Sequence, residues 1–205
     1  MTDNFKSTRN ALGRRSPNHS LLDLAKMGLL TLLLLALNNI SLFAQAPPFL
    51  DGKYDHWADS VLSTMTPEER IAQLIMIPAY SNKDKVHVDS IAGLVEKYGV
   101  GGIIFFQGGP VRQAHMINQF QQLSKVPLMI SLDGEWGLKM RLDSTVRFPY
   151  QMALGGVDDE KLIYDMGAEV ARQAKRAGIN VNFAPVVDVN NNANNPVIGF
   201  RSFGE

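Results

Sequence analysis

The chain has 205 residues, of which 45% are hydrophobic and 20% charged, with a formal net charge of zero, a composition that excludes a disordered or fibrous protein. Residues 1–46 hold five basic and two acidic side chains, so the rest of the chain carries a net charge of −3; this argues against a nucleic-acid partner, which needs a basic face. The absence of cysteine excludes disulfides, thiolate catalysis and cysteine-ligated metals.

Residues 1–46 have the pattern of a signal peptide. A basic stretch precedes an apolar run from Met27 to Leu37, and Ala44-Gln45-Ala46 fits a small-x-small cleavage site. The run is about ten residues long before asparagines interrupt it, whereas a membrane span needs roughly 20. We therefore predict an exported protein, periplasmic or secreted, that has no membrane contact after cleavage. The alternative is that the segment stays as an uncleaved anchor.

Two helices are predicted ahead of the first predicted strand. Thr66 is a suitable N-cap, Pro67 suits the first helical position, and Glu69 can complete a capping box. A second helical pattern covers residues 88–98, and Gly99 can end it in the left-handed conformation. The first helix is expected to continue through apolar residues at helical spacing, which are Ile71, Leu74 and Ile75.

Helices and strands alternate through the rest of the chain. Continuous apolar runs at residues 100–106 and 126–133 predict strands that are covered on both faces, as in parallel sheets. A helix starts at Pro110, and the clearest helix covers residues 160–177, with acidic residues at its start and basic residues at its end. Residues 179–183 begin a third strand. This alternation predicts an α/β fold made of βα units.

Charged residues near the predicted strand ends are candidate binding groups. Asp133 and Glu135 follow a buried strand, where carboxylates can bind a polar ligand or transfer protons, although an aspartate there is also common as a cap or turn residue. Arg201 could present several donors to a hydroxylated ligand, or could pair with an acid such as Asp133 or Asp188. Trp136 could stack on a sugar ring or simply cover the mouth of a barrel.

Glycine turns and histidines give no clear cofactor or metal site. Gly101-Gly102 precede a strand, whereas a dinucleotide fingerprint must follow one. Gly108-Gly109 could bind an anion at a helix start, as in an unrelated barrel enzyme for phosphorylated substrates, or could form a plain turn. We expect no metal and no cofactor, because no metal-ligand spacing connects His19, His56, His87 and His115.

Five segments occur in an order that is typical of one protein family. They are residues 66–74, 101–106, 133–137, 183–189 and 195–204. Together they resemble the N-terminal (β/α)8 barrel of glycoside hydrolase family 3, and the Asn-Pro-Val-Ile-Gly-Phe-Arg-Ser-Phe sequence at 195–203 looks like its β-N-acetylhexosaminidase branch. The family usually has glycine where this chain has Trp136. The resemblance implies an α/β fold that is a partial TIM (β/α)8 barrel, N-terminal part only, in residues 47–205.

The resemblance also implies a function and a site. It implies retaining hydrolysis of O-glycosyl bonds that releases terminal N-acetylglucosamine from cell-wall or chitin-type carbohydrate, with Asp133 and Arg201 as substrate-binding residues. The family's nucleophile and acid/base correspond to positions beyond Glu205, so no catalytic residue is expected in this chain. Roughly 160 residues after the leader would make an inactive part of a barrel that needs about 250. The alternatives are a β-glucosidase of the same family and a non-catalytic carbohydrate-binding barrel.

Overall fold

The structure is a computed structural model, and it describes residues 26–31 and 52–205. The predicted cleavage site and most of the predicted signal peptide lie outside these residues. The chain forms two units, Met1–His56 and Trp57–Glu205, and the described part of the first includes a helical segment at residues 26–31. Within the described ranges, no helix has the length and apolar character that crossing a membrane requires.

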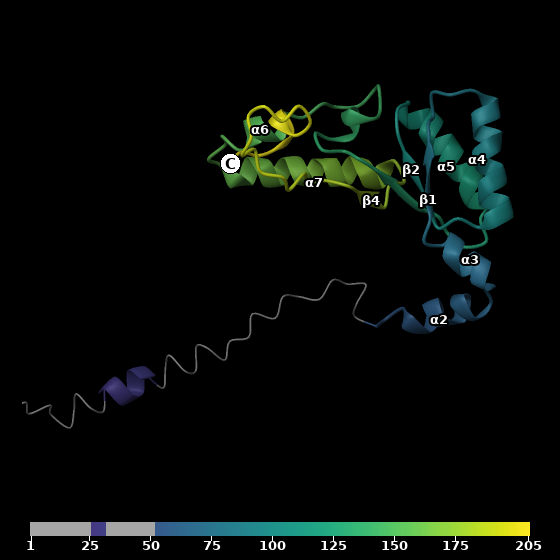
Figure 1. Cartoon of the computed structure of the whole chain (residues 1–205), viewed down its shortest axis with the longest axis horizontal. Helices are drawn as coiled ribbons and strands as arrows, with labels where there is room; N and C mark the ends of the chain where they lie inside the picture. The colour runs from purple at the N-terminus through teal and green to yellow at the C-terminus, as the bar shows by residue number, and fades with distance from the viewer. Residues whose placement is uncertain (1–25, 32–51) are drawn as a thin grey trace, which may run out of the picture. The chain divides into compact units, whose positions relative to one another are not determined.

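The second unit is built on a four-stranded parallel sheet with the strand order β1-β2-β3-β4 (Figure 1). Each strand pairs with the next one along the chain, and helices connect them, so the predicted α/β fold made of βα units is confirmed. The strands are β1 (Met76–Ala79), β2 (Gly102–Phe105), β3 (Met129–Leu132) and β4 (Val181–Asn182). The connecting helices are α4 (Lys85–Tyr98), α5 (Pro110–Leu123) and α7 (Glu160–Arg176). The shorter elements are α2 (Asp55–Ser63), α3 (Pro67–Ala72), η2 (Leu138–Met140), α6 (Gln151–Leu154) and η3 (Gly199–Arg201).

The ends of the helices follow the local sequence signals. At the start of α3 the amide of Glu69 donates to Oγ1 of Thr66 at 3.2 Å, and the amide of Thr66 donates to Oε2 of Glu69 at 3.0 Å, which completes the predicted capping box. Helix α4 ends at Gly99, whose φ of 65° is in the left-handed region that glycine adopts without strain. These contacts join residues close in sequence, which is why the sequence predicts them.

The first helix is shorter than predicted, and it is followed by a strand that was not predicted. Helix α3 ends at Ala72, and the chain then enters β1 at Met76. A four-residue strand that contains Pro78 has almost no periodic pattern, and its position depends on pairing with β2. The helical spacing that suggested a longer helix is coincidental, because Leu74 is 88% exposed. The exposed members of that pattern are Ile71, Leu74 and Ile75.

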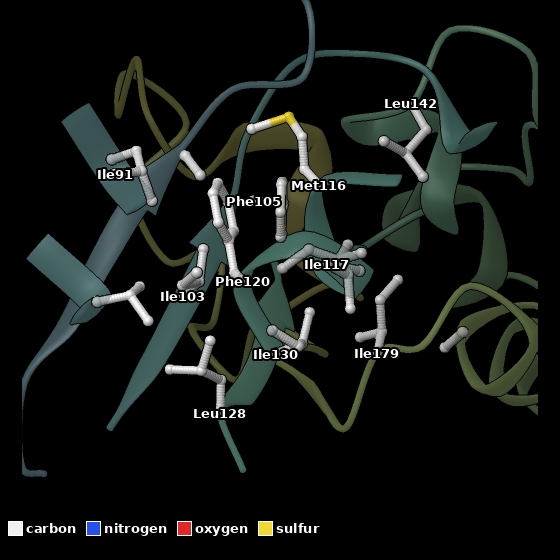
Figure 2. Packing of buried hydrophobic residues seen from close by; sticks show 14 of the residues in the cluster. Ile91, Ile103, Phe105, Met116, Ile117, Phe120, Leu128, Ile130, Leu142 and Ile179 are labelled. Carbon is white, nitrogen blue, oxygen red and sulfur yellow. The ribbon is translucent and has the colours of Figure 1, made fainter. Parts of the chain in front are cut away.

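The hydrophobic core lies between one face of the sheet and the helices (Figure 2). Since side chains alternate along a strand, Ile103 and Phe105 of β2 share this face with Ile130 and Leu132 of β3. All four are fully buried, and burying one such side chain stabilises the fold by about 1.5–3 kcal/mol. Helices α4, α5 and α7 complete the core with Ile91, Val95, Met116, Ile117, Phe120 and Ala174.

A glycine ahead of β2 allows close contact with the end of α3. The amide of Gly101 donates to the carbonyl oxygens of Ala72 and Ile75 at 3.0 and 3.1 Å, and a Cβ added to Gly101 would lie 1.9 Å from the carbonyl oxygen of Gln73. We expect Gly101→Ala to lower the free energy of unfolding by about 3 kcal/mol, the upper end for overpacking. Urea unfolding measures this loss.

Gly93 offers a matched control for that substitution. It lies inside α4, and a Cβ added there would meet nothing within 4 Å. Alanine is the better helix former, so Gly93→Ala should raise the free energy of unfolding by about 1 kcal/mol. Similar losses in the two variants would mean that the close approach at Gly101 is not what requires glycine.

Candidate functional site

The residues that directly follow β1, β2 and β3 form one layer at the carboxyl edge of the sheet. They are Tyr80, Phe106 and Asp133, and the strand register aligns them. The amide of Phe106 continues the pairing by donating to the carbonyl oxygen of Ala79 at 2.9 Å. Because side chains alternate along a strand, these three lie on the face opposite the core. In parallel α/β folds this edge is where ligands bind.

Asp133 forms an ion pair with an arginine of the following loop. Nη2 of Arg141 lies 2.5 Å from Oδ2 of Asp133, and the two side chains are 15% and 25% exposed, respectively. The guanidinium carbon of Arg141 also lies 4.7 Å from the centre of the Phe106 ring. Nε of Arg141 is buried and has no hydrogen-bond partner among the described residues. Arg141 is therefore held on two sides, by the carboxylate of Asp133 and by the ring of Phe106.

Arg201 forms a second ion pair, with Glu135. Its Nε lies 3.0 Å from Oε2 and its Nη2 lies 2.7 Å from Oε1, so the guanidinium binds the carboxylate through two parallel hydrogen bonds. The Glu135 side chain is 4% exposed and that of Arg201 is 29% exposed. The pKa of Arg201 is raised, chiefly by the hydrogen bond to Glu135, with weaker contributions from the charges of Asp188 and Asp133. Arg201 is thus in an ion pair, as one of the two alternatives predicted, but its partner is Glu135 and not Asp133 or Asp188.

One residue separates Asp133 from Glu135 in the loop after β3, and the charge of Asp133 acts on Arg201, so the two ion pairs are together called the charged array. Guanidinium groups supply only donors and carboxylates supply only acceptors, so the array can exchange hydrogen bonds with a ligand that carries many hydroxyl groups. Asp133 and Arg201 have no direct bond to one another. Arg141 is not among the predicted candidates, because it lies eight residues after Asp133 in a loop without periodicity. The proposed binding roles of Asp133 and Arg201 stay predictions.

The loop that carries Arg141 is fixed to the turn after β2. The amide of Gly108 donates to the carbonyl oxygen of Arg141 at 3.1 Å, and the amide of Asp143 donates to the carbonyl oxygen of Gly108 at 2.8 Å. The neighbouring amide of Gly109 donates to Oγ of Ser81 at 3.0 Å. Both glycine amides are thus used within the protein, which removes the basis for the phosphate-binding alternative.

Aromatic rings lie on the β1 and β2 side of the ion pairs. The rings of Tyr80 and Phe106 stack with centroids 5.4 Å apart, and Nζ of Lys83 lies 4.0 Å from the centre of the Tyr80 ring. His87 meets Tyr80 edge-on at 5.8 Å. Since Arg141 lies over Phe106, charged groups already cover this aromatic pair. The pair acts as a support for Arg141.

His87 makes the β1 side of the site sensitive to acid. Its Nε2 accepts a hydrogen bond from the amide of Tyr80 at 3.1 Å, and only a neutral imidazole has a lone pair for this bond. Burial, and then the charge of Lys83, lower the pKa of His87, while the charge of Asp84 opposes them. The unfolded chain therefore takes up a proton at higher pH than the folded protein does, and stability falls as the pH drops below about 6.5 towards the folded-state pKa.

We expect His87→Gln to reduce the loss of melting temperature between pH 7.5 and 5.5, because a glutamine oxygen can accept the Tyr80 bond at either pH. Thermal unfolding at several pH values measures the change. The exposed His115 on α5 provides the control, and His115→Gln should leave the pH profile as it is in the natural protein. Identical profiles for the natural protein and His87→Gln would contradict the role of His87.

A metal centre does not form in the part of the chain that the structure describes, since no three His, Cys, Asp or Glu side chains gather there. The described residues form a parallel α/β fold with two ion pairs beyond the carboxyl edge of its sheet. Residues 66–205 match the family model described as the glycosyl hydrolase family 3 N terminal domain, and the chain belongs to this family. The predicted family and its partial N-terminal barrel are thereby confirmed.

Relatives with known names agree with this membership. Beta-hexosaminidase A of Pseudoalteromonas piscicida is 34% identical over 128 residues, covering 56% of this chain and 21% of that protein. A beta-N-acetylglucosaminidase/beta-glucosidase of Cellulomonas fimi is 27% identical over 159 residues, covering 78% and 28%. The solved structure of a family 3 beta-N-acetylglucosaminidase from Paenibacillus sp. str. FPU-7 has a TM-score of 0.60 at 36% identity, covering 68% and 28%. This chain thus spans between 21% and 28% of the length of these three relatives.

Proposed function

We propose that the protein is a retaining β-N-acetylhexosaminidase that releases terminal N-acetylglucosamine from cell-wall or chitin-type saccharides. The proposal rests on two ion pairs, Asp133–Arg141 and Glu135–Arg201, near the strand ends of a family 3 chain. The names of the Pseudoalteromonas and Paenibacillus relatives support the choice of sugar.

In this proposal the chain's own residues hold the sugar. Asp133 would accept hydrogen bonds from sugar hydroxyls, and Arg141 and Arg201 would donate to hydroxyl or acetamido oxygens. A charge-assisted hydrogen bond of this kind is worth about 1.5–3 kcal/mol. Because an acidic partner fixes each arginine, the donors are already oriented before the sugar arrives, and correct orientation accelerates the reaction of a bound substrate.

Neither carboxylate of the array suits the bond-breaking steps. A retaining enzyme uses one carboxylate as nucleophile and a second carboxyl group as acid and base. Asp133 and Glu135 are each bound by an arginine, and the side chain of Glu135 is almost fully buried. The proposal therefore gives both residues a binding or positioning role and no covalent step.

A comparison of two substrates tests the proposal. The full-length gene product should release the aryl group from an aryl N-acetyl-β-glucosaminide with kcat/KM at least about tenfold above that for the aryl β-glucoside. Proton NMR of the first-formed sugar should show the β-anomer, which defines retention. The opposite preference would favour a β-glucosidase, the second candidate that the Cellulomonas relative's name suggests. Binding of chitobiose without cleavage of either substrate would favour a non-catalytic carbohydrate-binding protein.

We also propose that the protein is exported. The support is the basic stretch, short apolar run and Ala44-Gln45-Ala46 sequence of the leader. N-terminal sequencing of the mature protein should then find Pro47 as its first residue. A protein that keeps Met1 and fractionates with the cytoplasm would contradict export.

A further inference from the structure

We propose that Phe200, supported by Tyr150 and Trp136, is a stacking surface for a second pyranose unit of the substrate, next to the sugar that Asp133 and Arg201 hold. This inference rests on the proposed function. In a hydrolase that removes a terminal sugar, the second unit is the leaving saccharide. The surface would therefore contribute to specificity for the leaving saccharide and not to binding of the terminal N-acetylglucosamine.

Three rings from two distant segments form the surface. The Phe200 and Tyr150 centroids are 4.3 Å apart with planes at 49°, and the Tyr150 and Trp136 centroids are 4.8 Å apart with planes at 75°. Trp136 directly follows Glu135, and Phe200 directly precedes Arg201, so two of the three rings are joined through the backbone to the Glu135–Arg201 ion pair. The surface is thus adjacent in sequence to both members of that ion pair.

Exposure distinguishes this cluster from the other aromatic pair of the site. Charged groups lie over both Tyr80 and Phe106, which leaves that pair little room for a ligand. In the second cluster Arg147 lies 4.7 Å from the centre of the Tyr150 ring, so the ring that is open to a ligand is that of Phe200. Phe200 has one ring neighbour, Tyr150, among the described residues and is 54% exposed. A sugar ring has an apolar face of C–H bonds as well as its hydroxyls, and an exposed aromatic ring beside charged groups matches both.

The fold does not need Phe200 to hold Arg201 in place. Oγ of the buried Ser202 donates to the carbonyl oxygen of Asp188 at 2.7 Å and accepts from the amide of Gly204 at 3.2 Å. On the other side, Oδ1 of Asn195 accepts from the amides of Val197 and Ile198. Polar contacts therefore anchor the segment at both ends. Phe200 packs against Tyr150 on one side and is still 54% exposed, so part of its ring is open to a ligand.

Two substrates that share one terminal sugar test the surface. N,N′-diacetylchitobiose has a pyranose as its leaving group, whereas methyl N-acetyl-β-glucosaminide has none. In the full-length gene product, Phe200→Leu should lower kcat/KM for chitobiose about fivefold or more and that for the methyl glycoside by less than about twofold. The leucine keeps an apolar side chain but removes the flat ring. Phe203→Leu, on the same segment but lining a pocket with Pro185, should not change the ratio of the two rates.

The results of this experiment test the stacking surface and the proposed hydrolase function separately. Equal losses on the two substrates, or no loss on chitobiose, would overturn the stacking role while leaving the hydrolase in place. If the natural protein cleaves neither substrate, the proposed function fails, and calorimetric binding then tests the surface. In that case Phe200→Leu should weaken chitobiose binding and leave the binding of N-acetylglucosamine unchanged, and equal affinities for chitobiose would overturn the inference.

Discussion

Asp133→Ala will lower kcat/KM for an aryl N-acetyl-β-glucosaminide at least about tenfold, which corresponds to the low end of the energy of one charge-assisted hydrogen bond to a ligand. The residue stands at the carboxyl end of β3, in the layer that faces away from the core, with a quarter of its side chain exposed. Its loss removes a sugar acceptor and also releases Arg141 from its only acidic partner among the described residues. Steady-state kinetics of the full-length gene product measure the loss.

Two further variants define what the loss means. Asp133→Asn keeps the shape and an acceptor oxygen but not the charge, so its kcat/KM should fall between those of the natural protein and Asp133→Ala. Asp165→Ala also removes an aspartate from an ion pair, but on the exposed side of α7, where Lys161 is its partner. It should leave the kinetics within about twofold of the natural protein. An unchanged kcat/KM in Asp133→Ala would show that this residue does not bind the substrate.

Local interactions explain which parts of the fold could be predicted from the sequence. Two examples are the capping box of Thr66 and Glu69 and the left-handed conformation of Gly99. Both depend on residues within one or two helical turns, so the local residue types predict them. Strand β1 has no such signal. Its four residues form a strand because they pair with Gly102–Phe105. That pairing is a tertiary contact, so it cannot be predicted from a short window of sequence.

The same division applies to the site. Asp133 and Glu135 are recognisable as candidates because they follow a predicted strand, and Arg201 because it lies in a segment that resembles the family. The sequence does not predict which carboxylate pairs with which arginine. Arg201 reaches across 66 residues of chain to Glu135, and only the docking of η3 beside the β3 loop decides that partner. Arg141 shows the converse case, a nearby residue whose role depends on the Phe106 ring beneath it.

Arg201→Met will cost stability and activity together. The substitution keeps a long apolar stem but leaves the carboxylate of Glu135, with a side chain only 4% exposed, without its guanidinium partner. Breaking one half of a buried ion pair typically costs 3–5 kcal/mol, and because Arg201 itself is 29% exposed we expect about 3 kcal/mol of unfolding free energy. The lost sugar contacts should lower kcat/KM at least about tenfold in addition.

The double variant separates the two effects. Replacing both partners by apolar side chains removes the uncompensated charge, so Arg201→Met with Glu135→Leu should recover most of the stability that the single variant loses. It should recover none of the activity, because the donors to the sugar are still absent. Urea unfolding and steady-state kinetics on the same preparations give both numbers. Activity that returns along with stability would show that Arg201 only supports the fold, and a sugar-binding role for its guanidinium would then have no basis.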